Sequence, residues 1–207
     1  MAELTDLRDE QLLRLMQGGE EDAFTTLYRR RQGSIYRFVL EMSGSAPLAE
    51  DVTQEVFMAL VRESRGFDPT RGSLIAYLLG MARHHALRLL KRDQTYVPVA
   101  PEEEHWRNQG DIAPVSGEDP HSAMARRETI QSVRQAILSL PEHYREAVVL
   151  CDLNEMSYEE TASVLGCSVG TVRSRLHRGR ALLLQKLTGG VRVEPSREAL
   201  NGNRCLA

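Results

Sequence analysis

The chain has 207 residues, of which 42% are hydrophobic and 27% charged, and its formal net charge is −3. This composition allows one large or two small packed domains, and the overall charge gives no sign of nucleic-acid binding. The three cysteines are odd in number and match no zinc spacing, so we expect reduced thiols. The N-terminus lacks the apolar run of a signal peptide, and no segment is long enough to cross a membrane. We therefore expect a cytoplasmic protein.

The first 92 residues are expected to be helical throughout. Apolar residues recur near the 3.6-residue period, and no segment alternates with the period of a strand. Gly44 stands where a helix ends, and Pro47 occupies the first turn of the next one. A turn is expected at 66–72. The expected helices run from about 9 to 17, from 22 to 41, from 47 to 63 and from 73 to 92.

The expected helix at 73–92 carries a cationic stripe. Between Asp68 and Asp93 the chain has five lysines or arginines and no acid. An aromatic ring interleaved with cations suits single-stranded or distorted nucleic acid, although a basic helix end also simply complements the helix dipole. The stripe consists of Tyr77, His84, Arg88 and Lys91.

The middle and the end of the chain are expected to be flexible. Residues 93–125 hold seven acids, one arginine, several prolines and no apolar period, and such a segment cannot bury enough surface to fold alone. The glycine pair at 189–190 releases a tail, 189–207, that we expect to be disordered. Two helical domains at 1–92 and 126–188 are thus predicted, joined by a flexible acidic linker.

The C-terminal domain is organised around residues 157–186. Ser157 and Glu160 form a capping box, Gly166 supplies the left-handed residue that ends this helix, and Ser168 caps the next one. Residues 169–186 include five lysines or arginines and no acid, which is typical of the second helix of a helix-turn-helix in the major groove. A solvated basic helix that closes a small bundle is the structural alternative. The expected polar face comprises Arg173, Ser174, His177 and Arg178, and the apolar stripe comprises Val169, Val172, Leu176 and Leu183.

Three sequence blocks, in this order and spacing, resemble a known family. They are AEDVTQEVFMALVRE at 49–63, FDPTRGSLIAYLLGMARHHALRLLKR at 67–92, and LPEHYREAVVLCDLNEMSYEETASVLGCSVGTVRSRLHRGRALL at 140–183. The chain is similar over residues 9–187 to the extracytoplasmic-function (group 4) sigma factors of bacterial RNA polymerase. The resemblance implies an all-α protein with sigma regions 2 and 4, which directs core polymerase to promoters and helps to melt them. It implies no enzymatic activity, cofactor or metal.

The resemblance also implies roles for particular residues. The first block would grip the clamp helices of the largest polymerase subunit, and region 4 would meet the flap of the second-largest subunit. The second block would melt and read the −10 element, with a flipped base captured by the loop at 67–72, and the helix-turn-helix would read the −35 element. An anti-sigma factor is a further expected partner. The implied polymerase-binding residues are Asp51, Gln54, Glu55, Phe57 and Leu60; those for −10 DNA are Phe67, Arg71, Tyr77, Arg83, His84, Arg88, Lys91 and Arg92; those for −35 DNA are Ser168, Thr171, Arg173, Ser174, Arg175, His177 and Arg178.

Three positions depart from the family pattern. The family usually has Trp at the position of Tyr77, Asn at that of His84 and Asp at that of Arg88. Tyrosine still stacks on a base. The other two changes leave the −10 base preference open, whereas the grip on the DNA backbone is expected to survive or strengthen.

Two other protein classes compete with this interpretation. A response-regulator type of transcription factor has a similar helix-turn-helix, but it also needs a β/α receiver domain, and residues 1–92 contain no predicted strand. A helical hydrolase or nuclease could use the adjacent histidines at 84 and 85. No HExxH, paired-cysteine or paired-carboxylate spacing supports such a metal site.

Overall fold

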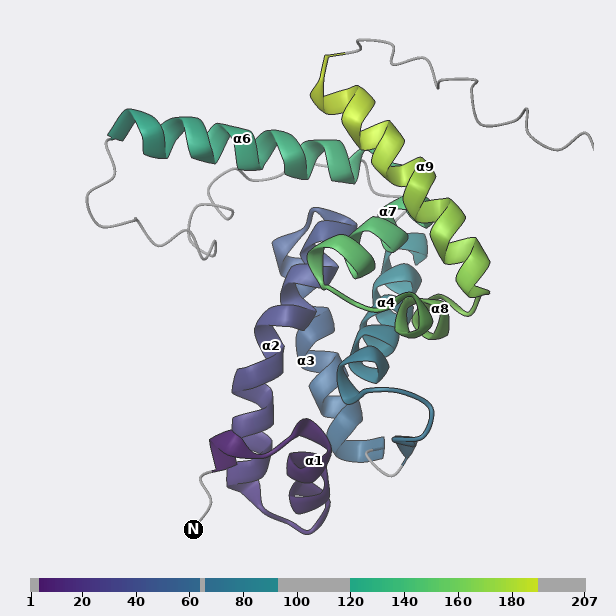
Figure 1. Cartoon of the computed structure of the whole chain (residues 1–207). Helices are drawn as coiled ribbons and strands as arrows, with labels where there is room; N and C mark the ends of the chain where they lie inside the picture. The colour runs from purple at the N-terminus through teal and green to yellow at the C-terminus, as the bar shows by residue number, and fades with distance from the viewer. Residues whose placement is uncertain (1–3, 64–65, 93–119, 190–207) are drawn as a thin grey trace, which may run out of the picture.

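The computed structural model describes residues 4–63, 66–92 and 120–189, and these are drawn in colour in Figure 1. All regular elements within these ranges are helical, which confirms the expected all-α class. Most of the predicted linker at 93–125 and nearly all of the predicted tail at 189–207 lie outside the described residues. The structure therefore does not test whether these two segments are flexible.

The N-terminal half, up to residue 92, is a bundle around the long helix α2 (Figure 1). Its predicted helices are confirmed within a few residues, and α2 ends at Gly44 in the left-handed conformation, as expected. The largest fully buried side chains in this half include Phe38, Leu27 and Leu60. The elements are a short 3-10 turn η1 (Leu4–Asp6), α1 (Asp9–Gln17), α2 (Glu21–Ser43), α3 (Ala46–Glu63) and α4 (Leu74–Arg92).

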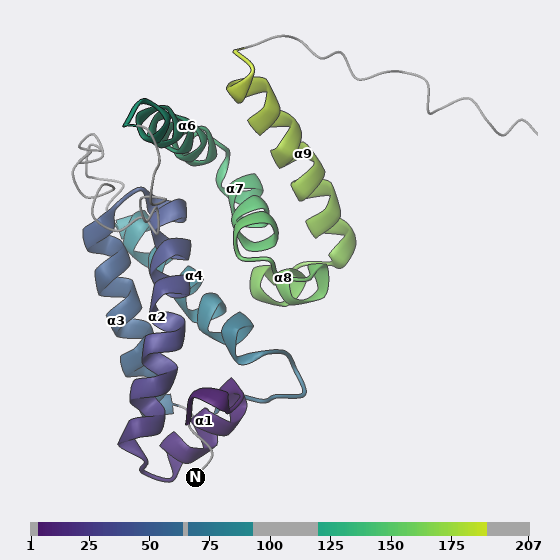
Figure 2. The ribbon, with the colours of Figure 1, turned by 60° about the vertical axis from the view of Figure 1, so that its left-hand side comes forward.

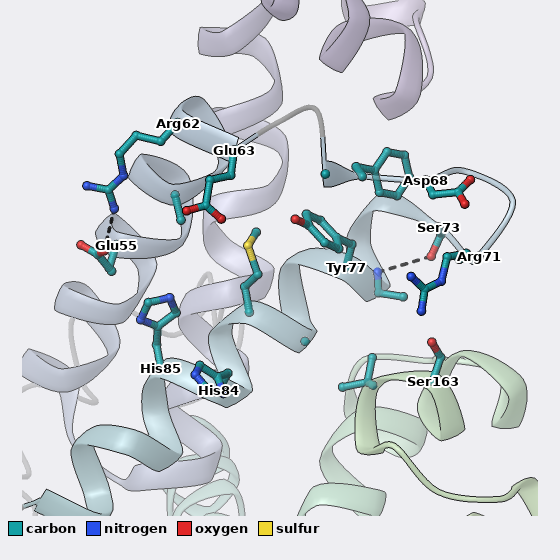
Figure 3. Close-up of a pocket in the computed structure, with 18 residues that line it drawn as sticks. Glu55, Arg62, Glu63, Asp68, Arg71, Ser73, Tyr77, His84, His85 and Ser163 are labelled. Atoms are coloured by element: carbon teal, nitrogen blue, oxygen red, sulfur yellow. Dashed lines mark hydrogen bonds and ion pairs between the residues drawn. The ribbon is translucent and has the colours of Figure 1, made fainter.

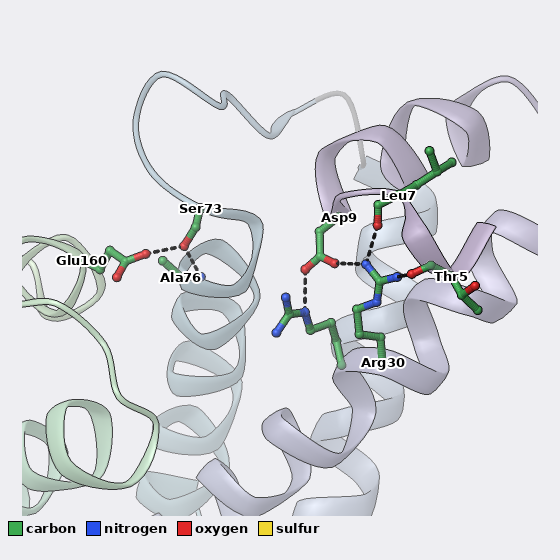
Figure 4. Close-up of polar contacts among 8 residues, drawn as sticks. Thr5, Leu7, Asp9, Arg30, Ser73, Ala76 and Glu160 are labelled. Carbon is green, nitrogen blue, oxygen red and sulfur yellow. Dashed lines mark hydrogen bonds and ion pairs between the residues drawn. The ribbon is translucent and has the colours of Figure 1, made fainter. Parts of the chain in front are cut away.

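A buried carboxylate ties the N-terminus to α2. Asp9, which is 7% exposed, accepts hydrogen bonds from Arg30 Nη1 at 2.9 Å and Arg31 Nε at 2.5 Å (Figure 4). Arg30 also donates to the backbone carbonyls of Thr5 and Leu7. Two guanidinium groups on one carboxylate satisfy a charge that would otherwise be costly to bury.

Residues 120–189, the part of the C-terminal half that the structure describes, contain four α-helices and a π turn. The first, α6, begins at Pro120, and proline fits the first position of a helix, so residues 120–125 of the predicted linker are helical. Its far end leads to α7, which continues directly into the π turn η4. The elements are α6 (Pro120–Leu138), α7 (Glu142–Val148), η4 (Val149–Leu153), α8 (Tyr158–Leu165) and α9 (Val169–Leu187).

The two halves lie against each other. Helix α8 packs against α4, and the region from α6 to η4 packs against the C-terminal part of α2 (Figure 2). One cluster of buried apolar residues runs through both halves, and Val149 and Leu150 of η4 are fully buried within it. This packing does not test the domain boundaries that the sequence predicts, and they remain a prediction.

The described helices were also searched for membrane spans. None of them combines the length and apolar character needed to cross a bilayer.

Candidate nucleic-acid interface

An open cleft of about 540 Å³ lies between α3, α4, the loop that joins them and α8 (Figure 3). This volume falls within the range of about 300–1,000 Å³ that is typical of small-molecule pockets. The cleft is lined by both acids and cations. Its labelled residues in Figure 3 are Glu55, Arg62, Glu63, Asp68, Arg71, Ser73, Tyr77, His84, His85 and Ser163.

The loop at 66–72 is shaped by Asp68. Its carboxylate oxygen Oδ1 accepts hydrogen bonds from Thr70 N at 2.9 Å and Thr70 Oγ1 at 2.7 Å. These two bonds hold the pKa of Asp68 below its usual value. The backbone N–H of Arg71 donates to the carbonyl of Asp68, which closes the expected turn and leaves Arg71 exposed at the rim.

An aromatic pair lines the cleft beside this loop. The ring centroids of Phe67 and Tyr77 lie 5.5 Å apart at an interplanar angle of 54°. Both side chains are half-buried, so part of each ring remains open to the cleft. Flat, partly exposed rings are the platforms on which single-stranded bases stack.

The rest of the predicted stripe follows α4 away from the cleft. His84, Arg88 and Lys91 are exposed, as expected, whereas the side chain of Arg92 lies outside the described residues. Arg83 is different, because its Nε donates to Glu146 of α7 at 2.5 Å. The structure therefore does not present Arg83 as an exposed cation.

His85 lies beside the stripe and is half-buried. The pKa of His85 is lowered, chiefly because the ring is partly buried and secondly because the positive charge of Arg88 lies close to it. Its Nδ1 lies 3.1 Å from Nη2 of Arg88, and a neutral ring nitrogen can accept that hydrogen bond.

The helix-turn-helix has the local geometry that the sequence predicts. Ser157 and Glu160 satisfy each other's backbone N–H groups, and Gly166 adopts the left-handed conformation with φ of 62°. Ser168 Oγ accepts from the backbone N–H of Thr171 at 3.1 Å and begins α9. Because these caps fix both ends of the turn, α9 leaves α8 in a defined direction.

The polar face of α9 is open to solvent. Arg173, Ser174, His177 and Arg178 are exposed, while Thr171 and Arg175 are half-buried. The guanidinium carbon of Arg173 lies 5.6 Å from the centroid of the Tyr158 ring, which favours one orientation of this side chain. One cation is already paired: Arg180 contacts Asp152 with its Nη2 at 2.5 Å.

The sequence analysis did not identify Gly179, a buried glycine of α9, as a packing residue. Gly179 lies where α9 crosses α7, and a Cβ atom there would lie 2.8 Å from Val148. The apolar stripe of α9 therefore continues through a position with no side chain, which a search for apolar periodicity does not count.

The implied polymerase-binding set on α3 divides between the core and the surface. Phe57 is 2% exposed and Leu60 is fully buried, so both lie in the core. Phe57 packs edge-on against Tyr28, with ring centroids 4.7 Å apart. The exposed apolar residues of α3 are instead Met58, at 49%, and Val61, at 52%. Of the other members, Asp51 and Gln54 are exposed and Glu55 is half-buried.

The described residues contain no group of three or more His, Cys, Asp or Glu side chains that could hold a metal ion.

The thiol of Cys151 is partly buried beside α8. Its Sγ lies 3.3 Å from Thr161 Oγ1, and burial raises the pKa of the thiol.

Comparison with known proteins decides among the protein classes. The model of sigma-70 region 2 matches residues 27–95, and that of sigma-70 region 4 matches residues 130–183. The RNA polymerase sigma-H factor of Pseudomonas aeruginosa is 34% identical over 183 residues, which cover 86% of this chain and 92% of that protein. The chain belongs to the extracytoplasmic-function sigma factors of the sigma-70 family.

Further relatives agree with this membership. The extracytoplasmic-function sigma-E factor of Escherichia coli K12 is 32% identical over 189 residues, covering 87% of this chain and 95% of the relative. This sigma factor thus directs core RNA polymerase to specific promoters and assists melting, and it catalyses no reaction itself. The response-regulator and hydrolase interpretations are set aside.

Solved structures show the same fold. RpoE of Bartonella quintana, in complex with the anti-sigma factor NepR, superimposes with a TM-score of 0.60 at 23% identity, covering 82% of this sigma factor and 98% of that chain. CnrH, in complex with the cytosolic domain of CnrY, gives a TM-score of 0.64 at 24% identity. The match covers 87% of this sigma factor and 97% of CnrH. At these identities the likeness concerns the fold alone.

Proposed function

We propose that the face of α4 and of the loop before it, which lines the cleft, binds the −10 element as a single strand. We further propose that α9 reads the −35 element and that an exposed face of α3 binds core polymerase. The observation that carries this assignment is the coexistence of two different cationic surfaces. One surrounds the aromatic pair of Phe67 and Tyr77 on α4 and the loop before it, and the other is the exposed polar face of a capped helix-turn-helix.

The chemistry of the cleft supports single-strand binding. A base that leaves the duplex needs a ring to stack on, and its phosphates need nearby cations. Phe67 and Tyr77 offer the rings, and Arg71 at the rim, with His84 and Arg88 further along α4, offers the polar and cationic groups. Lys91 and, from the sequence, Arg92 extend this track along the backbone.

The polar face of α9 supports reading of duplex DNA. Arg173, Ser174, His177 and Arg178 project from the N-terminal half of the helix, which is the part that meets base edges in helix-turn-helix proteins. Ser168, Thr171 and Arg175 lie nearer the helix start or its flank and suit phosphate contacts. Arg180 is held by Asp152 and is assigned no base contact.

The face of α3 combines charge with exposed apolar side chains. Asp51, Gln54 and Glu55 supply polar and acidic groups, and Met58 and Val61 supply apolar area. A patch that mixes exposed apolar side chains with polar neighbours is typical of a protein-protein interface. We assign it to the clamp helices of the largest subunit, and we assign the flap of the second-largest subunit to the C-terminal half.

Two further proposals concern the cell. The factor acts in the cytoplasm, where its polymerase and promoters are. It is restrained by an anti-sigma factor. Two proteins that share its fold support this proposal: RpoE of Bartonella quintana was solved with the anti-sigma factor NepR, and CnrH was solved with the cytosolic domain of CnrY.

Run-off transcription tests the assignment of the −10 site. Purified core polymerase, with and without the factor, transcribes the region upstream of the factor's own gene, and a discrete start that depends on the factor is expected. Tyr77→Ala should reduce open-complex formation by about 5- to 150-fold, because stacking on one ring is worth about 1–3 kcal/mol. Tyr77→Trp, which restores the residue usual in the family, is the matched control. Equal activity of all three proteins would overturn the −10 assignment.

A further inference from the structure

The N-terminal and C-terminal halves are joined by polar contacts along α4 and the end of α2. Ser73 Oγ at the start of α4 donates to Glu160 Oε1 of α8 at 2.6 Å (Figure 4). About three turns further along α4, Arg83 contacts Glu146. Beyond these, Arg145 Nη1 donates to the carbonyl of Met42 in α2. The contacts thus extend over much of the length of the N-terminal bundle.

The same interface has an apolar centre. Five residues of the C-terminal half are buried in one cluster with the core of α2, α3 and α4. Interfaces between domains of one chain resist separation when they are large and apolar, and are otherwise mobile. The apolar centre of this interface favours one closed arrangement of the two halves. The five residues are Ile137, Val149, Leu150, Met156 and Leu165.

Glu146 is the most informative member of the interface. Its residue exposure is 2%, and a carboxylate buried to this extent needs a charged or hydrogen-bonding partner. The partner is Arg83, which comes from the other half of the molecule. The C-terminal half therefore presents a carboxylate to a cation of α4 that DNA phosphate would otherwise contact.

Helix α8 also reaches the cleft itself. Ser163 and Val164 form part of its wall, and Ser163 lies across the cleft from Tyr77 (Figure 3). Hydrogen bonds from Ser73, with those from Ser157, hold the pKa of Glu160 below its usual value, so this contact is made by a carboxylate. The C-terminal half thus occupies one wall of the site proposed for the −10 strand.

The closed arrangement is incompatible with both promoter elements at once. By their names the elements lie about 25 base pairs apart, which is about 85 Å along duplex DNA. Helix α9 has 19 residues and is about 28 Å long, and α8 beside it touches the cleft. A chain in this arrangement cannot span the two elements.

We propose that this interface is an intramolecular latch, in which the C-terminal half covers the −10 face of α4 and Glu146 takes the place of a DNA phosphate on Arg83. The latch must open before the factor engages a promoter. This inference rests on the assignment of α4 and α9 to the two promoter elements. A latch that leaves about one molecule in ten open would lower the apparent affinity of free factor for single-stranded DNA about tenfold.

The test compares two doubly substituted full-length proteins. Glu146→Gln with Glu160→Gln removes the two carboxylates of the latch, and glutamine at position 160 still suits the capping box. Glu142→Gln with Glu159→Gln removes the same charge from exposed positions on the same two helices. Affinity for a fluorescent single strand of the −10 element and the radius of gyration in solution are measured for both.

The latch variant should bind the strand about fivefold or more tightly than the control and should have the larger radius of gyration. Equal affinity and equal radius would overturn the latch. If circular dichroism shows that the double variant is unfolded, Glu160→Gln alone is compared with Glu159→Gln, and equal binding by that pair overturns the proposal. Run-off transcription separates the two claims, because a factor that supports initiation while both pairs bind alike retains the proposed function and loses only the latch.

Discussion

Gly179 in α9 faces Val148 in α7 so closely that a Cβ atom at position 179 would lie 2.8 Å from Cγ2 of Val148. It would also lie 3.3 Å from the carbonyl oxygen of Tyr144. The missing side chain allows the two helices to approach, and this approach fixes where α9 carries its polar face.

Gly179→Ala should therefore destabilise the C-terminal half. Overpacking costs about 1–3 kcal/mol, which outweighs the gain of up to about 1 kcal/mol from replacing glycine within a helix. Thermal unfolding followed by circular dichroism measures the change. Gly170→Ala on the same helix is the control, because its Cβ would meet only Ser168 Oγ at 3.7 Å, and it should be neutral or stabilising. Equal melting temperatures for both variants would contradict the close packing.

Ser157→Ala should weaken the helix-turn-helix. The substitution removes the acceptor for the backbone N–H of Glu160, and the loss of such a cap costs about 0.5–2 kcal/mol. Ser163→Ala is made on the exposed side of the same helix and should change stability by less than about 0.5 kcal/mol. Chemical denaturation resolves the difference. The capping box would have no energetic weight if the two variants unfolded at the same denaturant concentration.

Substitutions on α3 separate a binding surface from a core. Met58→Ser with Val61→Ser should weaken binding to core polymerase with little change in stability, since both side chains are about half exposed. Phe57→Ala should instead cost about 3–5 kcal/mol of stability, because a buried ring is lost from the contact with Tyr28. Fluorescence titration with core polymerase and thermal unfolding give the two quantities. Unchanged polymerase affinity in the Met58/Val61 variant would remove those residues from the interface.

Arg173→Ala should relax promoter choice at the −35 element. A base contact is worth about 1–3 kcal/mol of discrimination, so the variant should lose about 5- to 150-fold between the preferred element and its mismatch. Lys186→Ala, in the last turn of the same helix, should weaken binding to both sequences alike or leave it unchanged. Holoenzyme binding to matched and mismatched promoters is the measurement. Retained discrimination in Arg173→Ala would show that this residue does not read a base.

His85 predicts a pH dependence of stability. Its pKa in the folded protein is lowered, chiefly by burial and then by Arg88, while Glu55 opposes the shift. As the pH falls below about 6.5, the unfolded chain takes up the proton first, so the contribution of neutral His85 is full above this pH and is lost as the pH falls toward the folded pKa. Unfolding free energies of the native protein and of His85→Gln, measured from pH 7.5 to 5, should converge toward the acid end. A constant difference would contradict the lowered pKa.

The sequence determined the local structure of this protein in detail. Ser157 with Glu160, Gly166 and Ser168 were sufficient to predict both ends of α8 and the start of α9, because a cap depends on residues within four positions of each other. The apolar period of 3.6 was sufficient for the helices of both halves. Three sequence blocks predicted membership of the sigma factors, and the comparisons with known proteins confirmed it.

Only the tertiary structure decided which face of each helix is accessible. Phe57 and Met58 are neighbours in the sequence, yet aromatic residues of α2 bury the first and leave the second exposed. Arg83 belongs to a basic helix by composition, but a carboxylate 63 positions later in the chain pairs with it. Periodicity tells which residues of a helix share a side, whereas the packing of distant segments determines what that side meets.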